Sequence, residues 1–191
     1  KSSVIYQMAD YFNSIWHHKY SKSINMPLTE KQRENARKTT EDLRRKAKIV
    51  KEEYQDLFNE PLDLMKISFP TNKVSFIHNP ITRFSKEPWC WYEITQLMKS
   101  AKKSIFIQSP YIIPSKQITK GFLDRNSFKD INITILTNSL GSTPNLPAYS
   151  GYLNHRKKII DQGIKVYEFQ STDSLHTKSF IIDDNLLIIG S

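Results

Sequence analysis

Apolar positions recur every three or four residues in two stretches near the start of the chain. The first stretch predicts an amphipathic helix over residues 3–18. The second follows Thr29, which forms a capping-box pattern with Gln32, and predicts a long helix with one thin apolar stripe among charged residues. Residues 21–27 have the composition of a linker, and residues 59–72 form a polar, proline-bounded segment. A stripe this thin indicates a helix that lies on the surface or bridges two parts of a larger protein.

From about residue 73 the pattern changes to short β-branched runs separated by longer helical stretches. The short runs predict six strands, over residues 74–78, 104–109, 131–137, 164–169, 176–182 and 186–189. The longer stretches predict three helices, over residues 87–102, 115–128 and 147–162, the last ended by Gly163 in a C-cap position. Residues 183–185 have turn composition, which makes the last two strands a hairpin.

Strands that alternate with helices imply crossover connections, whereas a terminal hairpin adds antiparallel pairing. We therefore expect an α/β fold, a mixed β-sheet flanked by helices, preceded by an N-terminal helical segment. The helix over residues 87–102 is expected to bury Trp89, Ile94, Leu97 and Met98. Residues 1–70 are interpreted as a helical linker or the tail of a preceding half. Residues 71–191 are interpreted as the main domain, truncated at its carboxyl end.

The chain is basic, with 28 Lys and Arg against 19 Asp and Glu and a formal net charge of +9. A basic surface favours an anionic partner: nucleic acid, an anionic membrane or a phosphorylated substrate. Charge alone does not choose among them, and a basic surface that only aids solubility remains an alternative. The single Cys90 excludes an intramolecular disulfide framework and a multi-cysteine zinc site. No apolar run approaches the roughly 20 residues of a membrane span.

One short pattern near the end of the chain points to chemistry. His176 and Lys178 are two apart in a predicted strand, so their side chains are expected on the same face. An imidazole beside an ammonium group is costly on a sheet face unless an anion meets them, and a phosphate group would do so. Lys178 would supply charge, and His176 could attack phosphorus or donate a proton. Asp183 follows His176 at the seventh position, and Gly190-Ser191 completes the pattern.

The full pattern, H-x-K-x(4)-D-x(6)-G-S, resembles the signature of the phospholipase D superfamily. The resemblance extends to other segments and is most apparent with bacterial cardiolipin synthase-type members. These segments are Gln108-Ser109-Pro110-Tyr111-Ile112-Ile113-Pro114, Leu136-Thr137-Asn138-Ser139-Leu140, Tyr149-Ser150-Gly151-Tyr152 with Arg156, and Gly163-Ile164-Lys165-Val166-Tyr167-Glu168. The resemblance implies a phospholipase D-like α/β/α sandwich, in which this chain is the carboxyl-terminal half.

The resemblance also implies a mechanism in which two H-x-K motifs act on a phosphodiester through a phosphohistidine. His176 is assigned as the general acid/base in preference to the nucleophile, and Lys178 and Ser191 as phosphate-binding residues. Asp183 is placed in the catalytic group, where it either orients and balances charge or only stabilises the turn. Tyr111 is a candidate for the wall of the site. No metal or other cofactor is expected.

Only one complete motif is present, so the chain is expected to supply half a site and to be inactive alone. Its partner would be the missing N-terminal half of the same protein or a second copy. The expected activity is that of a phosphatidyltransferase or phosphodiesterase acting on phospholipids, peripheral on an anionic bacterial membrane. Two alternatives remain: a nuclease-type phosphodiesterase acting on DNA or RNA, and a non-catalytic anion- or membrane-binding module.

Overall fold

The computed structural model describes residues 3–24, 26–59, 62–81, 87–113 and 128–190. The chain divides into two compact units, Lys1–Phe76 and Ile77–Ser191. The division lies six residues after the boundary at 70/71 that the sequence suggested.

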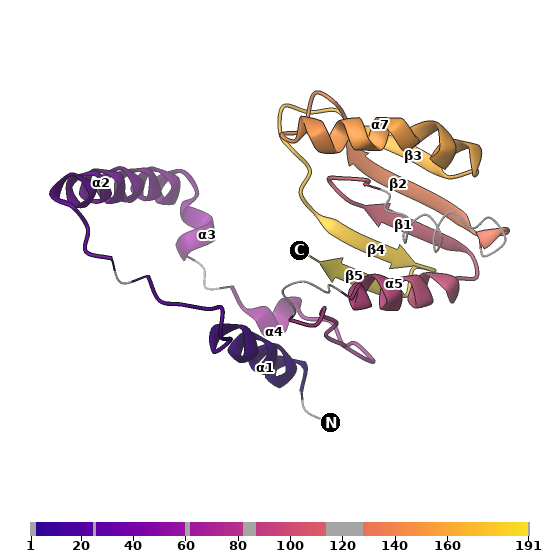
Figure 1. Ribbon diagram of the computed structural model, residues 1–191, viewed down its shortest axis with the longest axis horizontal. Coiled ribbons are helices and arrows are strands. Elements are labelled where there is room, and N and C mark those ends of the chain that lie inside the picture. The colour runs from indigo at the N-terminus through magenta and orange to yellow at the C-terminus, as the bar shows by residue number, and fades with distance from the viewer. Residues whose placement is uncertain (1–2, 25, 60–61, 82–86, 114–127, 191) are drawn as a thin grey trace. The chain divides into compact units, whose positions relative to one another are not determined.

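The first unit is helical. Its helices are α1 (Val4–Trp16), α2 (Glu30–Glu53), α3 (Gln55–Asn59) and α4 (Leu64–Ile67), and none of them contains a buried residue (Figure 1). The capping box is confirmed, because the Thr29 hydroxyl accepts from the Gln32 backbone and the Gln32 side chain accepts from the Thr29 backbone. Ion pairs one turn apart, such as Arg37–Glu34 and Lys46–Asp42, follow the charged faces of α2. Each pair of this kind contributes about 0.2–0.5 kcal/mol to an isolated helix.

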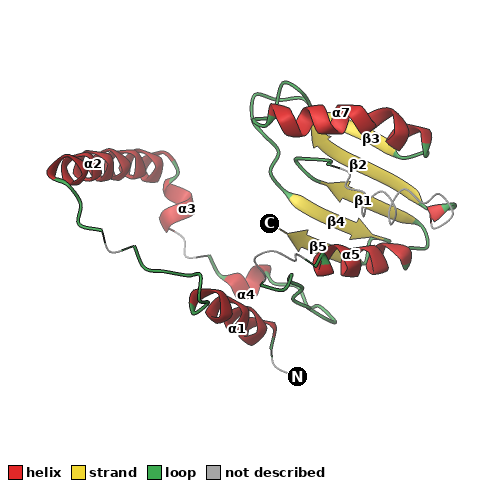
Figure 2. Cartoon of the chain, viewed as in Figure 1, coloured by secondary structure: helices red, strands yellow, loops and turns green. Residues whose placement is uncertain are grey.

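The second unit is built on a five-stranded sheet (Figure 2). The strands are β1 (Ser104–Gln108), β2 (Asn132–Asn138), β3 (Lys165–Phe169), β4 (Lys178–Ile182) and β5 (Leu186–Gly190), in the order β3-β2-β1-β4-β5. β1, β2 and β3 are parallel, whereas β4 runs antiparallel to β1 and β5 antiparallel to β4. The prediction of a mixed sheet is confirmed.

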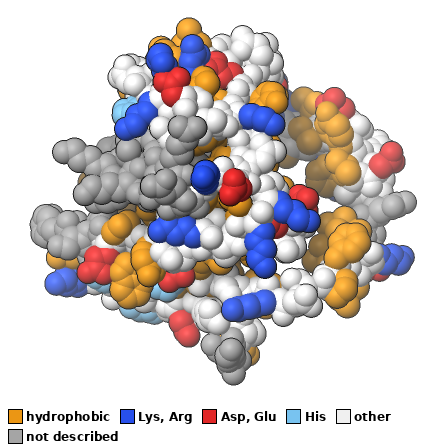
Figure 3. All heavy atoms as spheres, turned by 90° about the vertical axis from the view of Figure 1, so that its right-hand side faces the viewer, with side chains coloured by type: hydrophobic (Ala, Val, Ile, Leu, Met, Phe, Trp, Pro, Cys, Tyr) orange, Lys and Arg blue, Asp and Glu red, His pale blue; other side chains and the backbone are white. Residues whose placement is uncertain are grey.

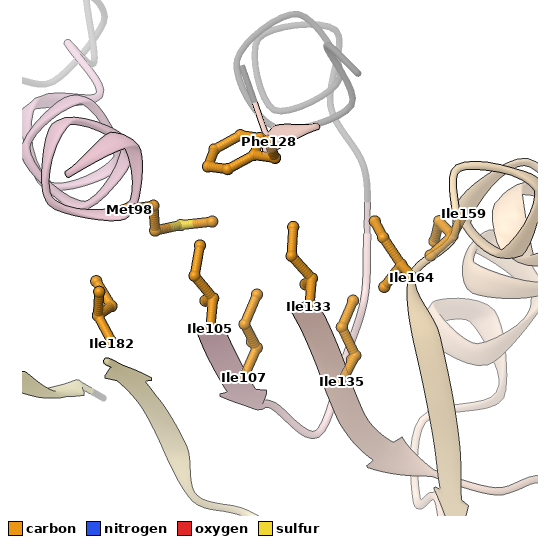
Figure 4. Close-up of a cluster of buried hydrophobic side chains, with 9 residues drawn as sticks. All are labelled: Met98, Ile105, Ile107, Phe128, Ile133, Ile135, Ile159, Ile164 and Ile182. Carbon is orange, nitrogen blue, oxygen red and sulfur yellow. The ribbon is translucent and has the colours of Figure 1, made fainter. Parts of the chain in front are cut away.

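Isoleucines on one face of this sheet form the core. They pack under α5 (Trp89–Lys99) and α7 (Leu146–Asp161), and Figure 4 shows Met98 from α5, Ile159 from α7 and Phe128 above them. The core cluster consists of Met98, Ile105, Ile107, Phe128, Ile133, Ile135, Ile159, Ile164 and Ile182. The fold class, a mixed α/β sheet with flanking helices, is therefore confirmed. No helix of the membrane-crossing kind, long and apolar throughout, occurs among the described residues.

Two local turns follow the sequence closely. The hairpin between β4 and β5 turns at Asp183 and Asp184, which both adopt positive φ angles, 51° and 58°. Aspartate tolerates this left-handed region better than most residues, so the turn composition has a direct conformational reason. Gly163, with φ of 81°, follows the C-cap of α7 as expected.

Two expectations have a different outcome, and a third is not tested. Residues 74–78 form no strand; Phe76 instead packs edge-on against Tyr11 of α1, with ring centroids 5.6 Å apart. Trp89 is 57% exposed rather than buried, because it lies in the first turn of α5, and its indole N–H donates to Glu87. Trp91 packs against the core in its place. The helix expected over residues 115–128 lies, apart from Phe128, outside the described residues.

Candidate active site

One edge of the sheet gathers the chain segments that the sequence singled out. β1, β2 and β3 are parallel, so their carboxyl ends, at Gln108, Asn138 and Phe169, lie along the same edge. β4 begins at this edge and β5 ends there, because Gln108 pairs with Ser179 and Lys178 pairs with Gly190. Ligands of open α/β sheets bind at the carboxyl ends of the parallel strands. A binding site is therefore expected at this edge.

His176 and Lys178 both lie at this edge. The strand expected to begin at His176 begins two residues later, so His176 is an exposed residue of the segment leading into β4. Lys178 is half-buried, and its Nζ donates a hydrogen bond to the backbone oxygen of His176, at 3.2 Å. Alternation along β4 puts Lys178 on the side of Phe180 and Ile182, whose side chains contact the core. The ammonium group therefore lies where the apolar core ends, next to the backbone of the histidine.

Tyr111 and Ser191 are the other residues expected to line or bind at the site. Tyr111 is half-buried and follows Pro110 directly after β1, and its backbone oxygen accepts from Ser109 Oγ at 3.0 Å. It therefore belongs to the same edge as Lys178. Ser191 lies outside the described residues, but Gly190, which precedes it, is the β-ladder partner of Lys178.

Asp183 lies away from this edge. It follows β4 at the other end, five residues from Lys178, which corresponds to about 16 Å at about 3.3 Å per residue. Its carboxylate accepts three backbone N–H groups: Lys102 at 2.7 Å, Lys103 at 2.8 Å and Ser104 at 2.9 Å. The donors of Ser104 and Lys102 hold the pKa of Asp183 below its usual value. Of the two roles left open for Asp183, this arrangement favours stabilisation of the turn over participation in the catalytic group.

Asn138 lies at the same edge, and the sequence did not predict a role for it. It is 1% exposed, and its carboxamide bonds both backbone groups of Leu175, the residue before His176. The available signal was an asparagine that ends a strand rich in β-branched residues, where a buried amide must find partners. The partners are 37 residues away in sequence, so that signal does not identify them.

A second polar cluster joins the end of β3 to α7. Glu168 accepts from Tyr152 at 2.9 Å, from Tyr149 at 3.2 Å and from Arg156 at 3.0 Å. Burial, followed by the bond to Glu168, raises the pKa of the Tyr152 phenol. The cluster fixes α7 against the sheet near the edge that holds His176. Within the described ranges, no group of three or more His, Cys, Asp and Glu side chains could hold a metal ion.

Sequence comparison identifies the class of protein to which this domain belongs. The family described as the PLD-like domain of cardiolipin synthase matches residues 94–191, just over half of the chain. The chain therefore belongs to this family, whose members are phosphodiesterases and phosphatidyltransferases of the phospholipase D superfamily.

Individual relatives match the same region. An uncharacterised protein of Helicobacter pylori is 38% identical over 107 residues, which cover 49% of this chain and 21% of the relative. Cardiolipin synthase 1 of Staphylococcus epidermidis is 32% identical over 102 residues, and cardiolipin synthase of Staphylococcus aureus is 33% identical over 109; each match covers 52% of this chain and about a fifth of the relative. These bacterial relatives support a bacterial origin for the chain. The match thus spans about a fifth of the length of these relatives.

A solved structure of the archaeal chromatin protein TrmBL2 aligns with 81% of this chain and 51% of its own, at a TM-score of 0.36 and 12% identity. A likeness of this size carries no argument about fold or function.

Proposed function

We propose that this chain supplies one half of a two-histidine site that transfers the phosphatidyl group of a phospholipid. The observation that carries the proposal is the position of His176 and Lys178 together at the carboxyl edge of the sheet, in a chain of the cardiolipin synthase PLD-like family. The second half of the site comes from another part of the same protein or from a second copy of the chain.

The proposed reaction consists of two displacements at phosphorus. One histidine attacks the phosphodiester, forming a P–N bond while the P–O bond to the leaving alcohol breaks, and the other histidine protonates that alcohol. The second histidine then removes a proton from the incoming alcohol or water, whose oxygen displaces the histidine nitrogen from phosphorus. We assign the acid/base role to His176. Lys178 stabilises the negative charge on the phosphoryl oxygens, and we propose Ser191 as a further phosphate ligand.

A phospholipid is the substrate that the comparisons favour, because two of the reported relatives are cardiolipin synthases. The net charge of +9 suits attachment to an anionic membrane surface. Figure 3 shows Lys and Arg side chains scattered over one face of the molecule with Asp and Glu among them, so the attraction would be diffuse. We therefore propose peripheral attachment to a bacterial membrane.

The test is a paired assay of the full-length protein that contains this chain. In one arm the protein is mixed with phosphatidylglycerol vesicles, and lipid products are followed by ³¹P NMR. In the other arm it is mixed with linear DNA, and strand cleavage is followed on a gel. We expect lipid turnover without DNA cleavage, and a rate that a chelator of divalent cations leaves unchanged, because the lysines supply the positive charge.

Three outcomes would contradict the proposal. DNA cleavage without lipid turnover would favour a nuclease-type phosphodiesterase, in which the basic surface contacts the nucleic acid backbone. Vesicle binding without turnover of either substrate would favour a binding module. Loss of lipid turnover in the chelator would indicate metal-dependent chemistry.

A further inference from the structure

The carboxamide of Asn138 holds the segment that carries His176. Its Oδ1 accepts from the Leu175 N–H at 2.9 Å, and its Nδ2 donates to the Leu175 carbonyl oxygen at 3.0 Å. A backbone N–H can only donate and a carbonyl can only accept, so these two bonds fix which way the amide points. The side chain of Asn138 thus pairs with Leu175 much as a neighbouring strand would. A third bond, from Nδ2 to Ser174 Oγ at 3.1 Å, extends the contact by one residue.

This pairing matters for His176 because of where β4 begins. The β-ladder starts at Lys178, two residues after the histidine. His176 is therefore held on one side by the start of β4 and on the other by Leu175, whose two backbone groups are bonded to Asn138. Loss of the carboxamide would leave two buried or half-buried backbone groups without these partners.

Asn138 is itself anchored to the sheet. It is the last residue of β2, and its ladder partner is Phe169 at the end of β3. Ser142 Oγ lies 3.4 Å from Asn138 Oδ1 and donates to the Phe169 carbonyl at 2.6 Å. The segment before His176 is thus connected, through Asn138, to the ends of two parallel strands.

We propose that Asn138 is a positioning residue for the reaction: it sets the place of the His176 backbone by bonding both polar groups of Leu175. This inference rests on the proposed function for the role of His176. Asn138 itself lies against the protein backbone and acts through the histidine. A misplacement of a reacting group by about 1 Å costs about 10²-fold in rate, so a small shift of the segment is expected to be visible in kcat.

The experiment compares Asn138→Ala with Thr137→Val in the full-length protein. Thr137 is a matched control, because it is 2% exposed and adjacent in β2 and bonds only weakly, through Oγ1, to the Pro110 carbonyl at 3.4 Å. Hydrogen exchange of the peptide covering residues 172–177 measures the hold on the segment, and kcat and KM measure the effect on the reaction. For Asn138→Ala we expect roughly tenfold faster exchange of that peptide and a roughly 10- to 100-fold lower kcat, with KM changed by less than about threefold. Thr137→Val is expected to stay near the wild type in exchange rate, kcat and KM.

Asn138→Asp tests the same proposal with a side chain of the same shape, and it decides the question if Asn138→Ala does not fold. An ionised carboxylate keeps the acceptor for the Leu175 N–H but loses the donor for the Leu175 carbonyl. Burial among acceptors raises the pKa of such a carboxyl, and the protonated acid has both a donor and an acceptor. The ratio of variant to wild-type kcat is therefore expected to rise as the pH falls from about 8 to about 5.

Faster exchange at residues 172–177 with an unchanged kcat would overturn the proposal, as would a kcat ratio for Asn138→Asp that does not change with pH. Equal effects of Asn138→Ala and Thr137→Val would also overturn it, since they would show only a general response to changes at the end of β2. A failure of the proposed function is distinguishable, because it would show as normal turnover in a variant lacking the His176 imidazole, whatever the exchange result.

Discussion

Replacing His176 with alanine in the full-length protein is expected to lower phospholipid turnover by about 10²- to 10⁴-fold. The imidazole is the group that is proposed to move the proton to and from the alcohol, and alanine has no group that could replace it. His176 is exposed and lies before β4, so the thermal midpoint, Tm, is expected to stay within about 2 °C of the wild type. The measurement is the initial rate on phosphatidylglycerol vesicles, together with a thermal melt.

His155→Ala is the matched control for this variant. His155 lies within α7, and its Nδ1 bonds the Gly151 carbonyl at 3.0 Å, so its removal deletes an imidazole that is not part of the H-x-K motif. Its turnover is expected to stay within about twofold of the wild type. Ordinary turnover by His176→Ala would refute the assignment, and equal losses in both variants would show that the effect is not specific to the site.

Replacing Asp183 with asparagine is expected to destabilise the domain and to lower Tm by roughly 5–10 °C. The asparagine would keep one acceptor, but its NH₂ group would face a backbone N–H, where the wild type has an oxygen that accepts from Lys102. The three backbone bonds of Asp183 join the β4–β5 hairpin to the start of β1. Their weakening is therefore expected to destabilise the central strand of the sheet. A thermal melt at neutral pH measures the change in Tm.

Asp184→Asn is the control, because it makes the same chemical change at the next residue of the turn, which is exposed. The dependence on pH gives a second check. The folded-state pKa of Asp183 lies below its unfolded value, so its stabilisation is present above about pH 4 and is lost as the pH falls through the folded pKa. The difference in Tm between wild type and Asp183→Asn should therefore narrow below about pH 4. An unchanged Tm combined with lost turnover would instead place Asp183 in the catalytic group.

Much of the sheet was predictable because its signals are local. Isoleucine-rich runs such as those of β1 and β2 alternate buried and half-buried positions, which is the pattern that a covered sheet face requires. The capping box at Thr29 and the left-handed turn at Asp183 depend on residues within a few positions of one another. Such features can be predicted from a few neighbouring residues.

The predictions failed where a contact with distant residues, or the position of a helix boundary, decides the structure. Residues 74–78 have strand composition, but a strand needs a neighbour, and the five-stranded sheet leaves them none among the described residues. Trp89 and Trp91 differ in burial because of where α5 begins, and helix boundaries are poorly specified by sequence.

The candidate site likewise combines a local sequence signal with contacts between residues far apart in the chain. The H-x-K spacing singled out His176 and Lys178 from three consecutive positions, and both lie at the carboxyl edge of the sheet. The bonds from Asn138 to Leu175 span 37 residues and those to Asp183 span 79 to 81 residues, so their geometry depends on the assembled fold.

The central claim, that the phosphatidyl group is transferred through a histidine in two steps, is tested most directly by the stereochemistry at phosphorus. The full-length protein would be given a phospholipid made chiral at phosphorus with oxygen isotopes, and the configuration of the product would be determined by ³¹P NMR. Each in-line displacement inverts the configuration, so two displacements predict overall retention. Inversion would show a single displacement by the acceptor and would contradict the account.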